Sequence, residues 1–162
     1  MNPASLLPTP EDEEPHGCQL LLLHTCTPRI DLKEEPLFNF MAKSLDFLRQ
    51  KSVDIALRQE TQLKIPDVHR CQNRHYRIAA SSSAPNKTKG VSILIKRNLN
   101  LNILESGADS NGRFSFIKCN FDSVKMCIFS VYAPNHQGDS FYDSLKQVVT
   151  AFLMPPTYPK CV

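Results

Sequence analysis

The sequence predicts a layered α/β fold in one domain of ordinary size. An amphipathic helix is expected over about 39–51, and a short apolar strand over 53–57 follows it at once, an order typical of layered α/β proteins. Residues 113–121 alternate in polarity and 124–132 follow after a short turn, which indicates an antiparallel hairpin. A 162-residue chain with 41% hydrophobic and 22% charged residues has a globular composition.

Two helices are predicted from apolar residues at helical spacing. In the first, Met41, Leu45 and Leu48 form the apolar stripe, and Asn39 is a candidate N-cap. The last helix is expected over 140–153, and two prolines stop it. Its apolar face consists of Phe141, Leu145, Val148 and Phe152.

Further strands are predicted from short apolar runs. They lie over 18–26, which contains four consecutive leucines, and over 75–80, 90–95 and 101–104. Between them, 81–90 is a basic, turn-rich loop and 109–112 is a turn signal.

The two ends differ from the body in composition. Residues 1–37 are rich in proline and acid at their start, so we expect a disordered or unrelated N-terminal extension. Residues 38–154 form the predicted domain, and 155–162 form a C-terminal tail.

Charge is distributed unevenly along the chain. Residues 1–38 carry seven acidic and two basic side chains, whereas 39–162 carry seventeen basic and nine acidic ones. A basic body suits a polyanion such as nucleic acid, because lysine and arginine displace the counterions of phosphates. An ordinary solvated surface is the alternative.

The cysteine pattern and the apolar runs indicate an intracellular protein. The six cysteines contain no Cys-x-x-Cys pair, which favours a reducing compartment without structural disulfides. The longest apolar run, over 20–23, is far too short to cross a membrane. It follows an acidic stretch, which argues against a secretory signal.

Four short motifs occur in a characteristic order. They are a strand ending in Gln-Glu-Thr (53–61), Lys-Gly-Val-Ser-Ile-Leu-Ile (89–95), Asn-Gly-Arg-Phe (111–114) and Val-Tyr-Ala-Pro-Asn (131–135). In this order and spacing they resemble the endonuclease/exonuclease/phosphatase superfamily, which includes DNase I-like and AP-endonuclease-like enzymes. The last motif and the lysine-led strand are most similar to the endonuclease domain of LINE-type retrotransposons.

The resemblance implies a partial four-layer α/β sandwich of the DNase I-like type, of which this chain supplies roughly the first sheet and its flanking helices. A half-sandwich would expose an apolar face and be prone to aggregate. The implied activity is Mg²⁺-dependent phosphodiester hydrolysis by a DNA endonuclease, with Mn²⁺ as an alternative cofactor. DNA is the implied partner and RNA the alternative, no membrane or obligate protein partner is indicated, and the nucleus is favoured over the cytoplasm.

The resemblance also assigns roles to individual residues. Glu60 is the implied metal ligand, since hard cations prefer carboxylates, and Tyr132 contacts the scissile phosphate. Gln59 supports Glu60 or the strand end. The implied nucleic-acid contacts are Lys87, Lys89, Arg113 and Asn135. The alternatives are a solvated strand end for Glu60 and Gln59, a half-buried aromatic for Tyr132, a turn for Asn135 and solvated loops for the cations.

Three motifs of the family have no counterpart between Met1 and Val162. They are the opening Trp-Asn-x-Asn-Gly, the Gly-Asp-x-Asn block and the Ser-Asp-His block that supplies the general base. Because such sites act as units, we expect weak or absent activity. The alternatives are a non-catalytic nucleic-acid-binding module and a non-functional fragment of a degenerate retroelement.

Overall fold

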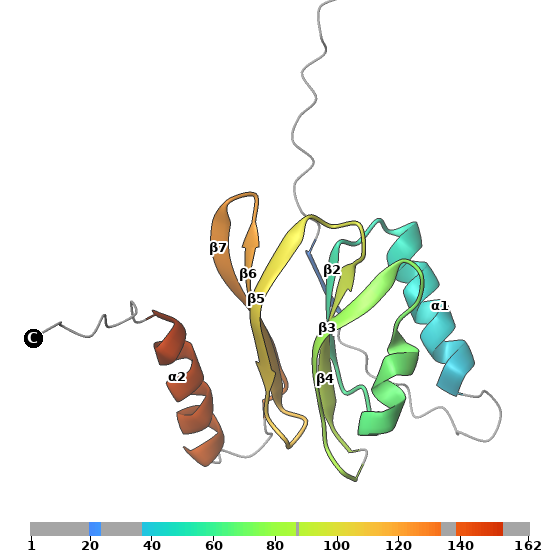
Figure 1. Cartoon of the computed structure of the whole chain (residues 1–162). Helices are drawn as coiled ribbons and strands as arrows, with labels where there is room; N and C mark the ends of the chain where they lie inside the picture. Colours follow the sequence, from blue (N-terminus) through green and yellow to red (C-terminus); the bar gives the residue numbers. More distant parts are fainter. Residues whose placement is uncertain (1–19, 24–36, 87, 134–138, 154–162) are drawn as a thin grey trace, which may run out of the picture.

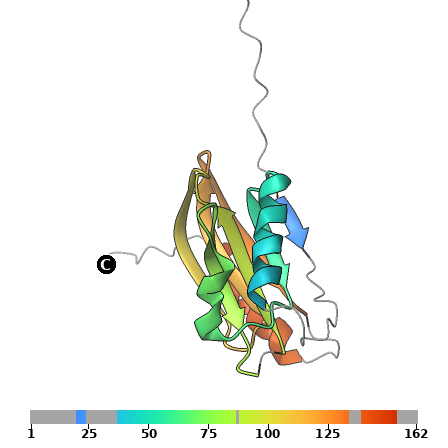
Figure 2. The ribbon, with the colours of Figure 1, turned by 90° about the vertical axis from the view of Figure 1, so that its right-hand side faces the viewer.

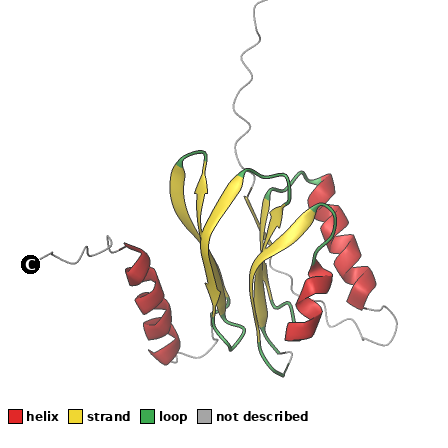
Figure 3. Ribbon diagram, in the orientation of Figure 1, coloured by secondary structure: helices red, strands yellow, loops and turns green. Residues whose placement is uncertain are grey.

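The computed structural model describes residues 20–23, 37–86, 88–133 and 139–153. The elements are β1 (Leu20–Leu23), α1 (Leu37–Gln50), β2 (Ile55–Gln59), the 3₁₀ helix η1 (Ile65–Cys71), β3 (Tyr76–Ser83), β4 (Gly90–Lys96), β5 (Leu101–Ala108), β6 (Phe114–Phe121), β7 (Val124–Val131) and α2 (Asp139–Leu153). Two sheets face each other, α1 and η1 cover the first, and α2 lies outside the second (Figure 1, Figure 3). The chain therefore forms a four-layer α/β sandwich.

The first sheet has the strand order β1-β2-β4-β3. Strand β1 runs parallel to β2, whereas β2 and β3 both pair antiparallel with β4. Every residue of β4 from Gly90 to Ile95 is buried, because the strand is central and both of its faces are covered. Figure 2 shows α1 lying along this sheet with β1 at its side.

The second sheet has the order β5-β6-β7, and its strands are antiparallel. The β6–β7 turn contains Asp122 and Ser123 at φ values of 46° and 70°, as the tight turn of a two-residue hairpin requires. Between the sheets lies the main core. It consists of Ile55, Leu57, Ile93 and Ile95 from the first sheet with Leu101, Ile117 and Cys119 from the second.

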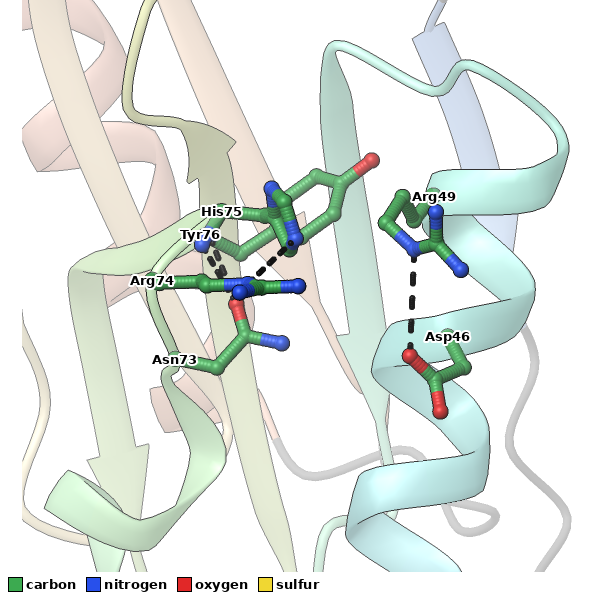
Figure 4. A network of polar contacts seen from close by, with 6 residues as sticks. All are labelled: Asp46, Arg49, Asn73, Arg74, His75 and Tyr76. Atoms are coloured by element: carbon green, nitrogen blue, oxygen red, sulfur yellow. Dashed lines mark hydrogen bonds and ion pairs between the residues drawn. The ribbon is translucent and has the colours of Figure 1, made fainter.

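A second core lies between the first sheet and α1. Leu45 and Leu48 are buried there, and Met41 is buried in a third cluster with Leu63 and Cys71, so the predicted apolar stripe is confirmed. Tyr76 closes the second core from β3, and its hydroxyl donates a 2.6 Å hydrogen bond to the carbonyl of Val53. Figure 4 shows the start of β3, where Asn73 Oδ1 accepts hydrogen bonds from the backbone N–H groups of residues 75 and 76.

Helix α2 packs on the outer face of the second sheet through aromatic contacts. The ring of Phe152 lies 4.8 Å from that of Phe116 and 5.8 Å from that of Phe129, measured between centroids. The predicted face of α2 is only half-buried at Phe141, Leu145, Val148 and Phe152.

Several sequence predictions need correction. The chain forms two sheets, not roughly one, because 101–131 builds a separate sheet that covers the apolar face expected to be exposed. Asn39 is not the N-cap, since α1 begins at Leu37. Ser81 to Ser83 belong to β3, not to a loop, and η1 was not predicted.

Other predictions are confirmed or remain untested. The leucines of β1 form the expected strand, and the hairpin and last helix are present. The predictions for 1–19, 24–36 and 154–162 lie outside the described residues, and the domain boundaries stay predictions. Among the described helices, none combines the length and the hydropathy of a membrane-spanning segment.

Candidate functional site

The ends of β2 and β7 are joined by two hydrogen bonds between the sheets. The Gln59 side chain donates from Nε2 to the carbonyl of Val131 at 2.6 Å. One residue earlier on each strand, the Ser130 hydroxyl donates to the carbonyl of Arg58 at 3.2 Å. Glu60 directly follows Gln59, and Tyr132 directly follows Val131. Both residues therefore leave their strands at the same end of the sandwich.

The backbone around Glu60 is held in an unfavourable conformation. Glu60 has a φ of 52° and Gln62 a φ of 49°, and each such left-handed residue other than glycine costs about 1–2 kcal/mol. The Thr61 N–H between them donates to the carbonyl of Gly90 at 3.0 Å. Strain of this kind is concentrated at functional sites, where surrounding contacts maintain it.

Glu60 carries a carboxylate that is half-buried. Among the described residues it has no hydrogen-bond or ion-pair partner. A partly desolvated carboxylate without a partner is favourable only if a cation or a donor approaches it. The end of β2 thus offers one carboxylate to a cation or a hydrogen-bond donor.

Gly90 brings the second motif against the first. A Cβ atom on Gly90 would collide with the hydroxyl of Thr61 and would lie 3.3 Å from the carbonyl oxygen of Ser82. A side chain at this position would force the Thr61 hydroxyl to move, so glycine lets β4 start this close to the Gln-Glu-Thr segment.

The turn between β5 and β6 is organised by Asp109, whose carboxylate accepts from three backbone N–H groups. Its Oδ1 accepts from Arg113 and Phe114, both at 2.9 Å, and its Oδ2 from Asn111 at 3.0 Å. The Ser82 hydroxyl also lies 2.7 Å from Oδ1. The negative charge of Asp109 is consequently compensated within the turn.

Gly112 fits this turn against the loop that precedes β4. Its φ is +72°, and a Cβ there would lie 2.8 Å from the backbone nitrogen of Ala84 and 3.0 Å from the carbonyl oxygen of Lys89. Both the conformation and the space exclude a side chain. The third motif is therefore packed directly on the second.

Arg113 connects the turn to Tyr132. The Tyr132 N–H donates to the carbonyl of Arg113 at 2.7 Å, and Nη1 of Arg113 donates to the carbonyl of Tyr132 at 3.3 Å. The guanidinium carbon lies 5.4 Å from the centre of the Tyr132 ring, within cation–π range.

These contacts close a ring of four motifs. We call it the motif ring: Gln59–Thr61 contacts Gly90, the segment before Gly90 contacts Gly112, Arg113 contacts Tyr132, and Val131 returns to Gln59. The four motifs are far apart in the sequence, and the tertiary structure brings them together at one end of the sandwich.

A hollow of about 600 Å³ lies beside the motif ring. The loop before β4, the 109–114 turn and the first turns of α2 line it, including Asn86, Lys89, Asn111, Arg113 and Phe141. Neither Glu60 nor Tyr132 lines it, so the hollow is separate from the carboxylate. Lys89 and Arg113, both predicted to bind nucleic acid, are thus brought to one surface.

The Mg²⁺ expected at Glu60 can be tested against the donors present. In the described ranges, no group of three or more His, Cys, Asp or Glu side chains gathers to hold a metal ion. Mg²⁺ keeps several waters and is commonly bound through one or two carboxylates together with substrate phosphates. The unpartnered Glu60 carboxylate fits one position of such a shell.

The remaining predicted residues have different outcomes. Gln59 contacts β7, while Lys87 and Asn135 lie outside the described residues. The sequence predicted the turn at 109–112 but did not identify Asp109 as the residue whose carboxylate organises it. Arg58 and Thr61, polar residues at and just beyond the end of β2, are buried, with exposed fractions of 1% and 6%.

Comparison with known proteins shows the fold. No family model matches the chain. The endonuclease domain of TRAS1, a telomere-specific non-LTR retrotransposon, aligns with a TM-score of 0.53 and 14% identity over 82% of this chain and 52% of that one. TDP2 from D. rerio, solved in complex with a single-stranded DNA product, aligns with a TM-score of 0.55 and 14% identity over 85% and 55%.

These likenesses confirm the predicted fold, the DNase I-like α/β sandwich. The chain spans about half the length of the solved structures that it matches.

Proposed function

We propose that this chain carries part of a Mg²⁺-dependent phosphodiesterase site that acts on DNA, as in the endonuclease of a LINE-type retrotransposon. The motif ring is the observation that supports the proposal. It places an unpartnered carboxylate, a phenol and a guanidinium at one end of a fold shared with two nucleic-acid-processing proteins.

The chemistry assigns a part to each group. Phosphodiester hydrolysis requires an activated water and neutralisation of the charge that develops on the phosphate. Glu60 would hold the cation, which supplies Lewis acidity and lowers the pKa of a bound water. Tyr132 would contact the scissile phosphate, and Arg113, stacked on the Tyr132 ring, would neutralise phosphate charge beside it.

Low activity is part of the proposal. In the described part of the chain, Glu60 belongs to no group of three or more His, Cys, Asp or Glu side chains that could hold a metal ion. Hydrolysis also requires a base within hydrogen-bond reach of the attacking water. We therefore expect slow turnover and weak metal affinity, with Mn²⁺ able to replace Mg²⁺.

Nicking of a supercoiled plasmid tests this function. Wild-type protein should nick slowly with Mg²⁺ or Mn²⁺ and stop when the metal is chelated. Glu60→Gln should reduce nicking to background, since it removes the metal-binding charge while preserving size. Glu105→Gln, which changes an exposed glutamate of β5, is the matched control and should nick as the wild type does. Equal rates for Glu60→Gln and wild type would refute the proposal.

A non-catalytic nucleic-acid-binding module is the second candidate. It is favoured by the separation of the Lys89 and Arg113 surface from Glu60. Such a module would bind DNA or RNA with salt-dependent affinity, would not nick, and would be unaffected by Glu60→Gln. A nuclear location would suit either function.

A further inference from the structure

We propose that the hollow beside the motif ring binds one unpaired nucleotide of a single strand, with its base against Phe141 and its phosphate against Lys89 and Arg113. This inference rests on the proposed function, because it names the part of the substrate that flanks the cut. Nothing in the motifs of the sequence points to Phe141 as a binding residue.

The size and composition of the hollow suit a nucleotide. Its volume of about 600 Å³ is in the range of small-ligand pockets, about 300–1,000 Å³. Its lining combines two cations, Lys89 and Arg113, with an aromatic wall formed by Phe114 and Phe141. Asn86 and Asn111 add amides, which can both donate to and accept from base edges.

The charge in the hollow favours an anion. Lys89 and Arg113 are its cations, and Asp109 is its only carboxylate among the described lining residues. Because three backbone N–H groups and the Ser82 hydroxyl bind that carboxylate, it presents little negative potential to a ligand. A phosphate would therefore lie beside Lys89 and Arg113.

The position of Arg113 orients the nucleotide. Arg113 lines the hollow and also stacks over the ring of Tyr132. A phosphate held by Arg113 would thus lie between the hollow and the motif ring. The base attached to this phosphate would point away from Glu60 and toward α2.

The aromatic wall indicates an unpaired base. Phe141 is half-buried at the hollow, and the neighbouring Tyr142 ring meets it edge-on, with 5.1 Å between centroids. In a duplex both faces of a base are covered by its neighbours, so only an unstacked base can lie against such a ring. Single strands, frayed ends and flipped bases share this chemistry.

Fluorescence anisotropy with a labelled single-stranded DNA tests the inference, with metal chelated so that no cleavage occurs. Phe141→Ala should weaken binding about tenfold, the usual effect of losing one stacked base, without changing the salt dependence. Lys89→Gln should weaken binding and lower the salt slope by about 0.7. Phe47→Ala is the matched control, since Phe47 is 43% exposed on α1, and it should bind as wild type does.

Further variants separate stacking from loss of structure. Phe141→Tyr keeps the ring and should restore wild-type affinity. An oligonucleotide with abasic sites should bind wild-type protein about tenfold more weakly than the intact strand does. Its affinity for Phe141→Ala should equal its affinity for wild-type protein. A covalently closed circular duplex, which has no ends to fray, should bind wild-type protein and Phe141→Ala with equal affinity.

Three results would overturn the inference: equal single-strand affinity for Phe141→Ala and Phe47→Ala, equal losses on single strand and closed duplex, or no effect of the abasic sites. Any of them would leave Glu60-dependent nicking untouched. Conversely, plasmid nicking that does not depend on Glu60 would refute the catalytic proposal without affecting this binding test.

Discussion

Replacing Arg58 by an apolar residue of similar length should stabilise the fold. Arg58 is 1% exposed in β2, beneath α1. Its Nη2 lies 3.4 Å from the sulfur of Met41, and its Nε and Nη1 have no hydrogen-bond partner. Burial lowers the pKa of this guanidinium, although the nearby Cys71 opposes the shift. A buried charge without an ionic partner is therefore unfavourable in this core.

The magnitude follows from two opposing contributions. Removing an unpaired buried charge gains several kcal/mol, and apolar replacement of buried ionic groups has stabilised proteins by about 1–4 kcal/mol. Because Met fills most of the space of Arg, the packing loss should stay below about 1.5 kcal/mol. We expect Arg58→Met to stabilise the protein by about 2 kcal/mol, which corresponds to a rise in Tm of about 5–10 °C.

Urea denaturation followed by circular dichroism would measure this gain as a higher midpoint at unchanged slope. Arg49→Met is the matched control, because the Arg49 side chain is 53% exposed and pairs with Asp46 at 3.9 Å. It should change stability by no more than about 0.5 kcal/mol. If Arg58→Met proved less stable than wild type, the guanidinium would have a compensating partner and the reasoning would be wrong.

Three other perturbations test the site and its surroundings. Gly112→Ala should destabilise the protein by at least about 1–3 kcal/mol in thermal unfolding, since it strains a φ of +72° and drives a Cβ toward backbone atoms at 2.8–3.0 Å. Glu60→Gly should raise Tm slightly, by relieving strain of about 1 kcal/mol, while abolishing nicking. Burial raises the pKa of the Cys71 thiol from 9.0 to about 11. Between pH 9 and 11 the folded state keeps a thiol proton that the unfolded state releases. The contribution of Cys71 to the free energy of unfolding is therefore complete below pH 9 and decreases by about 2–3 kcal/mol as the pH rises to 11. Cys71→Ala should flatten that part of the profile of unfolding free energy against pH.

Each of these outcomes has a clear opposite. A Gly112→Ala protein as stable as wild type would mean that the turn can move away from Lys89. A lower Tm for Glu60→Gly would show that the left-handed conformation costs little there. An unchanged alkaline profile in Cys71→Ala would assign the decrease to other groups, such as Tyr76, whose pKa burial also raises.

The sequence alone determined most of the helices and strands and which of their faces are apolar. The helical spacing of Met41, Leu45 and Leu48 identified the face of α1 that is buried, and alternation from 113 to 132 identified the hairpin. These patterns are readable because the periods of helices and strands differ. The order of the four short motifs likewise indicated the fold that the structural comparisons support.

Only the tertiary structure decided which faces cover one another. An apolar face shows that a partner exists but not which segment supplies it, so two facing sheets could not be distinguished from one. The burial of Arg58 had the same origin. In the sequence Arg58 begins a polar run. In the structure it pairs with Ser92 of the buried strand β4, so it remains part of β2 and is covered by α1.

The candidate site depends still more on long-range contacts. The hydrogen bond from Gln59 to Val131 spans 72 residues, and the hollow exists only because α2 lies near the loop before β4. Local sequence predicted the residue types, since charge and turn chemistry are local properties. Their convergence at one end of the sandwich is a consequence of sheet packing, which no short segment of the chain encodes.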